Sequence, residues 1–249
     1  MNLLAFDTST DQLSIAVSRV VDGHTQVWTH SGPGGALASS TLIPAVLALL
    51  AQAGLGLREL GAIAFGAGPG SFTGLRTACA VAQGLGYGAG VPLLPVDSLL
   101  AVAEDARHTH AGDAARLSVV AVLDARMDEV YTARYVWADA RWTQPGDWAV
   151  CKPEALAQAP DAPPPAERGP WVVAGNAFAA YGERLLPGWL RVDALPTAAA
   201  LLRLAPALLA AGQAVPADQA LPRYIRDKVA KTTDERALEK AAALAATVP

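Results

Sequence analysis

Short apolar runs separated by polar turns dominate the first hundred residues of the chain. Leu3–Phe6 and Ala62–Phe65 are continuous apolar runs of the length of buried strands. Leu13–Val17 alternates apolar and polar side chains, as a strand with one covered face does. Asp22-Gly23 is a typical hairpin dipeptide, so Gln26–Thr29 is expected to pair with the strand before it.

Longer apolar segments between these strands predict helices. One helix is expected over Ser39–Ala53, with Ser39 or Ser40 as its N-cap and Pro44 tolerated near the first turn. It follows a predicted loop at 32–35. A second helix is expected to start near Thr73 and to end in the stretch 84–90. After a strand at 92–96, Asp97 or Ser98 would cap a third helix that ends near residue 106.

A weak internal repeat indicates a second, related unit. Asp7 and Asp11 follow the first strand and precede an alternating one, and Asp124 and Asp128 follow a strand over 117–123 in the same way. The later segments predicted are a proline-rich excursion over 158–170, a strand at 171–175, a helix over 197–211 and a tail from residue 235 that frays. We therefore predict an α/β protein with an N-terminal lobe, 1–106, and a smaller, loop-rich C-terminal lobe, 107–249.

Composition narrows the class of protein. The chain has 249 residues, of which 52% are hydrophobic and 17% charged, and its net charge of −4 disfavours a dominant nucleic-acid surface. Cys79 and Cys151 form no disulfide framework. No signal peptide is recognised, and the apolar stretch 42–57 is too short and too interrupted for a convincing membrane span. A cytoplasmic protein without membrane contact is expected.

The stretch Gly68-Pro69-Gly70-Ser71-Phe72-Thr73-Gly74-Leu75-Arg76 lies between a predicted strand and a predicted helix. A loop this rich in glycine can point backbone N–H groups at an anion such as phosphate. The alternative is that its glycines let a tight turn pack closely against the sheet. Asp7, just after the first strand, also has two interpretations: it contacts a magnesium nucleotide, or it caps its own turn.

Two predicted helical segments carry no charge at all. Leu37–Leu57 and Thr77–Val96 contain no Asp, Glu, Lys or Arg, whereas a helix that covers a sheet normally shows a polar stripe to water. Either both helices are buried inside the protein, or they form an apolar interface with a partner. The interface interpretation predicts partner contacts at Leu42, Ala45, Val46, Leu49, Arg76, Ala80 and Gln83.

Residues for catalysis are hard to find in the sequence. His24, His30, His108 and His110 form no metal-binding motif, and no serine has nucleophile-elbow spacing. Cys79 lies in an apolar helical segment and is expected to be an inert core thiol. A peptidase is therefore not supported, and neither a metal nor a cofactor is predicted. An ATP-dependent small-molecule kinase remains the alternative function.

Four segments together resemble the TsaB family, also called YeaZ, of bacterial accessory proteins for threonylcarbamoyladenosine modification of tRNA. They are the glycine-rich stretch followed by 82–85, the opening strand 4–10, the run Leu123-Asp124-Ala125-Arg126-Met127-Asp128-Glu129-Val130-Tyr131 and the element Pro222-Arg223-Tyr224-Ile225-Arg226. The resemblance implies a two-lobed fold of the actin, sugar-kinase and Hsp70 type, built from two RNase H-like units. It implies a vestigial nucleotide site at Asp7, Gly68, Gly70, Ser71, Thr73 and Gly74.

The function that the resemblance implies is that of a non-catalytic partner and activator of TsaD. TsaD would transfer the threonylcarbamoyl group to the tRNA adenosine next to the anticodon, the ATPase TsaE would dock on the pair, and tRNA would be contacted through the complex. TsaB proteins pair through their first two helices, with themselves or with TsaD, so a homodimer of this chain is one possible state when TsaD is absent, and the sequence does not decide whether it forms. Ser9 replaces the glycine of kinase-like relatives, and Ala38 stands where many TsaB proteins keep a histidine. The basic residues Arg223, Arg226, Lys228 and Lys231 could contact tRNA or TsaE, or form a solvated tail.

Overall fold

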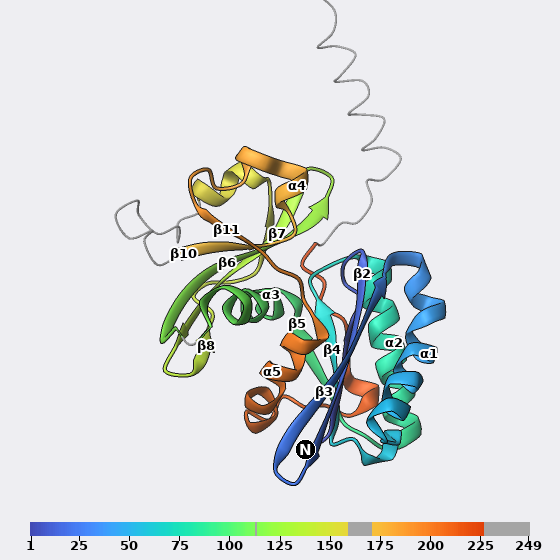
Figure 1. Ribbon diagram of the computed structural model, residues 1–249. Helices are drawn as coiled ribbons and strands as arrows, with labels where there is room; N and C mark the ends of the chain where they lie inside the picture. The colour runs from blue at the N-terminus through green and yellow to red at the C-terminus, as the bar shows by residue number, and fades with distance from the viewer. Residues whose placement is uncertain (113, 159–170, 227–249) are drawn as a thin grey trace, which may run out of the picture.

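The structure, a computed structural model, describes residues 1–112, 114–158 and 171–226 and consists of two lobes, each built on one mixed sheet (Figure 1). In the first lobe the strand order is β3-β2-β1-β4-β5. Its central strand β1 is antiparallel to β2 and parallel to β4. The strands of this sheet are β1 (Leu3–Asp7), β2 (Gln12–Val21), β3 (His24–Pro33), β4 (Ala62–Gly68) and β5 (Leu93–Asp97).

The second sheet repeats this topology. Its order is β11-β10-β6-β7-β8, and its central strand β6 is antiparallel to β7 and parallel to β10, as β1 is to β2 and β4. The duplication predicted from the spacing of the aspartates is confirmed, and with it the two-lobed fold of the actin and sugar-kinase type. The strands are β6 (Arg116–Arg126), β7 (Glu129–Ala138), β8 (Arg141–Thr143), β9 (Ala149–Cys151), which pairs with β7, β10 (Trp171–Gly175) and β11 (Leu190–Asp193).

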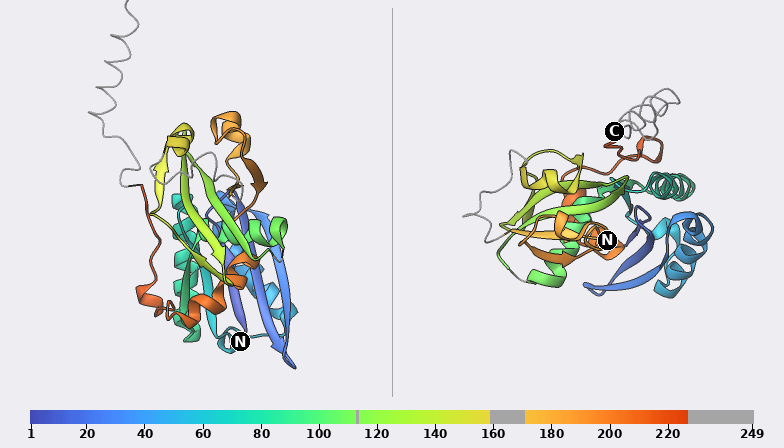
Figure 2. Two further views of the ribbon diagram at one scale, coloured as in Figure 1. Left: turned by 90° about the vertical axis from the view of Figure 1, so that its left-hand side faces the viewer. Right: turned by 90° about the horizontal axis from the view of Figure 1, so that it is seen from above.

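Helices cover the sheets unevenly. In Figures 1 and 2, α1 (Ala38–Ala53) and α2 (Phe72–Ala89) lie on the side of the first sheet that faces away from the second lobe. On its other side, α3 (Ser98–Ala106) and α5 (Ala198–Ala210) lie toward the second lobe. The second lobe carries the four-residue α4 (Phe178–Tyr181). Short helical turns complete the described elements: η1 (Gly35–Leu37), η2 (Leu57–Glu59), η3 (Arg107–Ala111), η4 (Pro153–Gln158), η6 (Gly182–Arg184) and η7 (Ala217–Gln219).

Each half of the chain gives one helix to the core of the other lobe. Leu99 and Val102 of α3 are fully buried among the residues of β6, β7 and β10. Leu201 and Ala205 of α5, which follows the second sheet in sequence, are fully buried against β1 and its neighbours. The exchange of α3 and α5 joins the two lobes through packed helices rather than through a linker. The domain boundary predicted after residue 106 therefore stays a prediction.

Several local predictions need correction. β2 and β3 are longer than predicted, so that residues 32 and 33 belong to β3 instead of a loop. Neither Ser39 nor Ser40 caps α1, because η1 runs directly into the helix and the two hydroxyl groups donate to the carbonyls of Ala36 and Leu37. The predicted cap at Asp97 is confirmed, since its carboxylate accepts from the backbone N–H of Leu99.

One helical segment among the described residues, Gly35–Ala53, is long and apolar enough to cross a membrane. Its side chains Leu42 and Val46 are fully buried in the core between α1, α2 and the first sheet. A helix that contributes fully buried side chains to the core in this way is consistent with a helix of the folded first lobe. The predictions that the protein has no membrane contact and is cytoplasmic remain predictions.

Candidate functional site

The glycine-rich stretch connects β4 to α2 and packs on the turn between β1 and β2. The backbone N–H of Ser71 donates to the carbonyl of Ser9 at 2.7 Å, and the Thr8 hydroxyl donates to the carbonyl of Gly74 at 2.7 Å. Ser71 also caps α2, because its hydroxyl accepts from the N–H of Gly74 at 3.5 Å. The loop is therefore joined to the first strand end by backbone contacts on both sides.

Glycine is required here by close approach of backbone. A Cβ atom on Gly70 would lie 2.5 Å from the Ser9 Cβ, and one on Gly74 would lie 1.8 Å from the Thr8 carbonyl oxygen. Both distances are shorter than any real Cβ contact, so only glycine fits without a backbone shift. Of the two interpretations offered by the sequence, this geometry favours close packing over a phosphate cradle.

Asp7 ends β1 in a buried position. Its carboxylate accepts from the backbone N–H and the hydroxyl of Ser9, both at 2.7 Å, and from the hydroxyl of Ser98 at 3.2 Å. Burial raises the pKa of Asp7 from 3.8 to about 6, although these hydrogen bonds act in the opposite direction. Asp7 is 1% exposed, so its carboxylate is occupied inside the lobe.

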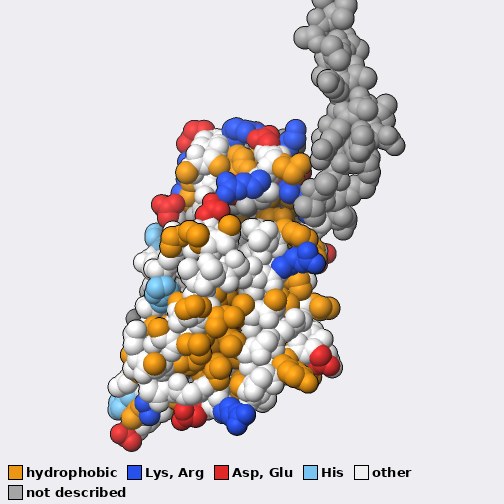
Figure 3. Space-filling view, turned by 90° about the vertical axis from the view of Figure 1, so that its right-hand side faces the viewer, with side chains coloured by type: hydrophobic (Ala, Val, Ile, Leu, Met, Phe, Trp, Pro, Cys, Tyr) orange, Lys and Arg blue, Asp and Glu red, His pale blue; other side chains and the backbone are white. Residues whose placement is uncertain are grey.

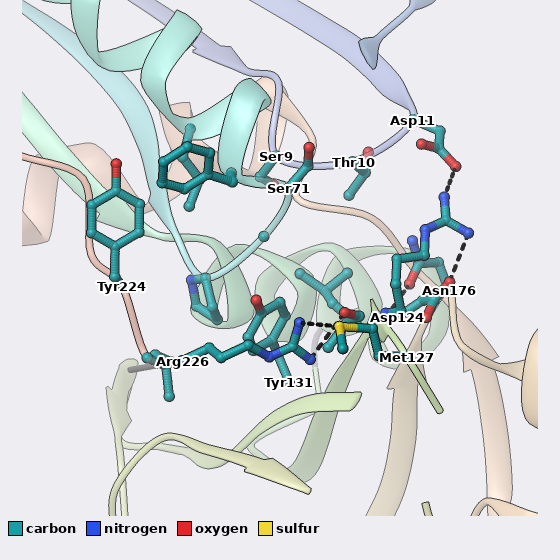
Figure 4. Close-up of a pocket in the computed structure, with 18 of the residues that line it drawn as sticks. Ser9, Thr10, Asp11, Ser71, Asp124, Met127, Tyr131, Asn176, Tyr224 and Arg226 are labelled. Carbon is teal, nitrogen blue, oxygen red and sulfur yellow. Dashed lines mark hydrogen bonds and ion pairs between the residues drawn. The ribbon is translucent and has the colours of Figure 1, made fainter. Parts of the chain in front are cut away.

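A cleft of about 440 Å³ opens between the lobes, at the ends of β1 and β6. Of the six predicted nucleotide-site residues, Gly70 and Ser71 line it, whereas Asp7, Gly68, Thr73 and Gly74 do not. Figure 4 shows side chains from both lobes pointing into this space. The other polar side chains in the lining are Ser9, Thr10, Asp11, Asp124, Arg126, Tyr131, Asn176, Arg223, Tyr224 and Arg226.

Three arginines line the cleft, and two of them, Arg126 and Arg226, make close ion pairs there. Arg126 bridges the lobes, with one Nη atom 2.6 Å from Asp11 of the first lobe and the other 3.0 Å from Asp124 of the second. Arg226 donates to Glu129 at 2.6 Å and to the carbonyl of Ala125 at 3.1 Å. Each guanidinium is thus matched by carboxylates, and the cleft has no strong net charge. Arg126 was not among the predicted site residues, although it lies within the run 123–131 that carried the family resemblance.

The segment 220–226, named here the C-terminal strap, crosses from the first lobe to the second. The backbone N–H of Arg223 donates to the carbonyl of Ala67 at 2.6 Å, and the guanidinium of Arg223 lies 3.9 Å from Asp97. Arg226 holds the other end of the strap on the second lobe through Glu129. Arg223 and Arg226 are therefore engaged with this chain's own carboxylates, while Lys228 and Lys231 of the predicted basic run lie outside the described residues.

Asp97 is a second buried carboxylate, and it joins β5 to the second lobe. Its Oδ2 accepts from the hydroxyl of Tyr135 and from the indole N–H of Trp148 at 2.7 Å. Burial raises the pKa of Asp97 above its ordinary value, while these donors and Arg223 lower it. The contacts to Tyr135 and Trp148 therefore connect the end of β5 to the second lobe.

The predicted partner-binding residues do not share one surface. Leu42, Val46 and Leu49 are at most 3% exposed and belong to the core under α1, so they cannot contact a partner; this part of the prediction is wrong. Of the remaining four, Ala45 and Gln83 are half-buried, and Gln83 donates to the carbonyl of Ala220. Arg76 and Ala80 are exposed. The sequence misled because α1 is apolar on all sides, so that its periodicity did not reveal the face that packs on the sheet.

The exposed side of α1 is nevertheless apolar. Leu37, Ile43 and Leu47 are 56%, 42% and 49% exposed, and Figure 3 shows hydrophobic side chains gathered in the middle of this face. Tyr87 of α2 is 83% exposed. Charged side chains are absent from residues 37–57 and 77–96, so this face of the described structure is uncharged over most of both helices.

Hydrolysis would need a bound metal ion or a reactive nucleophile such as a thiol. Among the described residues, no set of three or more His, Cys, Asp or Glu side chains is placed to hold a metal ion. Cys79 is buried in α2, and its thiol donates to the carbonyl of Ala220 at 3.4 Å, a contact that fits a core position.

Comparisons with known proteins point to one family. The family described as "TsaD: tRNA N6-adenosine threonylcarbamoyltransferase" matches residues 35–242. The chain is 34% identical to the tRNA threonylcarbamoyladenosine biosynthesis protein TsaB of Haemophilus influenzae, over 92% of this chain and 95% of that protein. It is 32% identical to TsaB of Escherichia coli K12, over 92% and 96%. The solved structure of YeaZ from Pseudomonas aeruginosa superimposes with a TM-score of 0.76 at 38% identity, over 90% of this chain and 99% of that one.

Proposed function

This chain belongs to the TsaB family of tRNA threonylcarbamoyladenosine biosynthesis proteins, and from that membership we propose that it is the non-catalytic partner and activator of a TsaD-type transferase. In this role it binds TsaD, and TsaD transfers the threonylcarbamoyl group to the tRNA adenosine beside the anticodon. A TsaE-type ATPase docks on the pair, and tRNA is reached through the complex.

The observation that carries the proposal is the exposed apolar face of α1. Leu37, Ile43 and Leu47 leave about half of each side chain in water, in a region without any charge. A monomer rarely exposes such a surface unless a partner covers it. TsaD is the partner that family membership suggests. The same face would pair two copies of this chain when TsaD is absent.

The first strand end supports a non-catalytic role. The carboxylate oxygens of Asp7 accept hydrogen bonds from Ser9 and Ser98, and Asp7 does not line the cleft. The Ser71 N–H, which a phosphate would need, donates to the Ser9 carbonyl instead. The alternative, a small-molecule kinase, would require both groups to turn toward a bound magnesium nucleotide. Isothermal titration with Mg-ATP tests it, and binding that disappears in Asp7→Ala would favour the kinase.

The partner face is tested with charges placed on exposed positions. Leu47→Asp and Ile43→Asp change side chains that are already in water, so both variants should keep the fold. We expect each to weaken a one-to-one complex with TsaD by more than roughly tenfold, because a carboxylate would be buried without a partner. Size-exclusion chromatography with light scattering measures the complex.

The matched control is Leu190→Asp, which places the same charge at a side chain that is 54% exposed on the second lobe. This variant should bind TsaD as the parent does. Complex formation that survives both α1 variants would contradict the assignment of this face, and the absence of any complex with the parent would contradict the proposed function itself.

A further inference from the structure

Two aromatic rings lie exposed beside each other at the mouth of the cleft. Phe72, the first residue of α2, is 43% exposed, and Tyr224 of the C-terminal strap is 48% exposed. Their ring centroids are 5.5 Å apart, with an angle of 35° between the planes. Phe6 and Phe65 of the first sheet, by contrast, are completely buried. Figure 4 shows Tyr224 at the edge of the cleft.

Guanidinium groups accompany the rings. The Arg76 guanidinium lies 4.9 Å from the centre of the Phe72 ring, and Arg76 makes no ion pair with another described residue. Arg223, next to Tyr224, is 43% exposed and lies 4.1 Å from the ring of Trp148. We refer to Phe72, Arg76, Arg223 and Tyr224 as the aromatic rim. Its polar neighbours Ser71 and Thr73 are exposed, so the rim differs from the uncharged, apolar face of α1.

The strap holds Tyr224 in place from both sides. Before it, the carbonyl of Ala220 accepts from Gln83 at 2.8 Å and the N–H of Arg223 donates to Ala67. After it, Arg226 donates to the carbonyl of Ala125. The backbone therefore presents the ring in a fixed position, although nearly half of the side chain remains in water. A pre-organised exposed ring lowers the entropy cost of binding a flat ligand.

We propose that the aromatic rim binds an unpaired stretch of RNA, with a base stacked on the rings of Phe72 and Tyr224 and Arg76 directed at a phosphate. Aromatic rings with neighbouring guanidinium groups suit unstacked bases of any sequence, because every base has a π-face. The proposal rests on the proposed function, in which tRNA is the substrate of the complex.

The experiment measures RNA affinity by fluorescence anisotropy, with the full chain and a labelled anticodon stem–loop RNA, alone and with TsaD present. A fully paired RNA duplex of the same length is the comparison ligand. We expect the stem–loop to bind more tightly than the duplex. Phe72→Ala and Tyr224→Ala should each weaken stem–loop binding roughly tenfold. Arg76→Ala should lower the slope of log affinity against log salt by about 0.7, as the loss of one phosphate contact does on a single strand.

Tyr87→Ala is the matched control, because Tyr87 is an exposed aromatic residue of the same helix outside the rim. It should bind RNA like the parent. Phe72→Leu and Tyr224→Leu keep most of the buried volume but remove the ring, and loss of RNA binding in them excludes a folding defect as the cause.

Unchanged RNA affinity in all four ring variants would overturn the proposal, as would a parent complex that does not prefer the stem–loop. Binding to TsaD is measured in parallel. Ring variants that lose TsaD but keep RNA would identify the rim as a protein contact and overturn the proposal, while leaving the proposed function intact. Failure of the proposed function would instead appear as no TsaD complex with the parent.

Discussion

The two lobes share one strand order, yet the aspartate after the first strand has a different environment in each. Asp7 is 1% exposed, and its carboxylate accepts from Ser9 and Ser98 within its own lobe. Asp124 lines the cleft and accepts from Arg126 at 3.0 Å and from the hydroxyl of Tyr181 at 2.8 Å. The repeat in sequence thus produced one sealed strand end and one that faces the cleft.

The segment after the strand that pairs in parallel with the central strand, β4 in one sheet and β10 in the other, accounts for the difference. In the first lobe, β4 leads through the glycine-rich loop into the 18-residue helix α2, which closes over the turn after β1. In the second lobe, β10 leads through Asn176 to the four-residue α4. Asn176 accepts from the N–H of Asp124 and lines the cleft. A shared topology therefore fixes where a site can lie, while the covering segment decides whether it stays open.

The largest effect should come from breaking the seal of the first lobe. Gly74→Ala places a methyl group 1.8 Å from the Thr8 carbonyl oxygen, so α2 must move away from β1. We expect a loss of about 3 kcal/mol in the free energy of unfolding, measured by urea denaturation. The change would expose the end of β1 at Asp7, as the end of β6 at Asp124 already faces the cleft.

Gly84→Ala in the same helix is the control. No atom lies within 4 Å of the added methyl group, so the substitution should stabilise the protein by about 1 kcal/mol through helix propensity. Equal effects of the two substitutions on stability would show that the contact between α2 and the turn after β1 is not what buries Asp7 and distinguishes the first lobe from the second.

An effect of about the same size should follow from removing the buried charge of Asp7. Its pKa is about 6 in the folded protein and 3.8 ordinarily, so the folded state binds the proton more tightly between these values. The contribution of Asp7 to stability is therefore greatest below about pH 4 and is lost as the pH rises through about 6, by roughly 3 kcal/mol. Asp7→Asn, which keeps an acceptor for Ser9, should remove this loss.

Urea denaturation of parent and Asp7→Asn across this pH range tests the expectation. The advantage of the variant should grow as the pH rises from about 4 to about 7. Asp124→Asn is the comparison in the other lobe, and the loss of its ion pair with Arg126, whose side chain is 68% exposed, should cost no more than about 1 kcal/mol. If the free energy of unfolding of Asp7→Asn depended on pH as that of the parent does, then ionisation of a buried Asp7 would not be the cause of the pH dependence.

Much of the fold was predictable because its elements carry local patterns. The apolar runs at β1, β4 and β6, the turn at Asp22-Gly23 and the cap at Asp97 follow from side-chain periodicity and turn chemistry. The start of α1 was predicted to within one residue, but the serine N-cap was wrong because η1 runs directly into the helix. The exchange of α3 and α5 between lobes was not predicted, since sequence order does not tell which sheet an apolar helix covers.

The candidate site was less predictable than the fold. Of the residues predicted for a vestigial nucleotide site, Gly70 and Ser71 line the cleft, and that site stays a prediction. The sequence could not show that Asp7 faces inward, because this depends on Ser98, which is 91 residues away. Leu42 and Leu47 look equivalent in an all-apolar helix, yet only the first is buried. Arg126, the last residue of β6, gave no signal beyond its place in the run 123–131. Contacts between distant segments decided each of these cases.

The smallest effect concerns the link between the two strand ends. Arg126 joins Asp11 of the first lobe to Asp124 of the second, but the side chains of Arg126 and Asp11 are 68% and 81% exposed. Ion pairs at such positions contribute little because water and salt screen them, so Arg126→Ala should change the free energy of unfolding by less than about 0.5 kcal/mol. The buried contacts of Asp97 with Tyr135 and Trp148 would then hold the lobes together without it. Thermal unfolding at low and high salt measures this. A larger loss that vanishes at high salt would show that the charges at the cleft, rather than the packing behind it, set the position of the lobes.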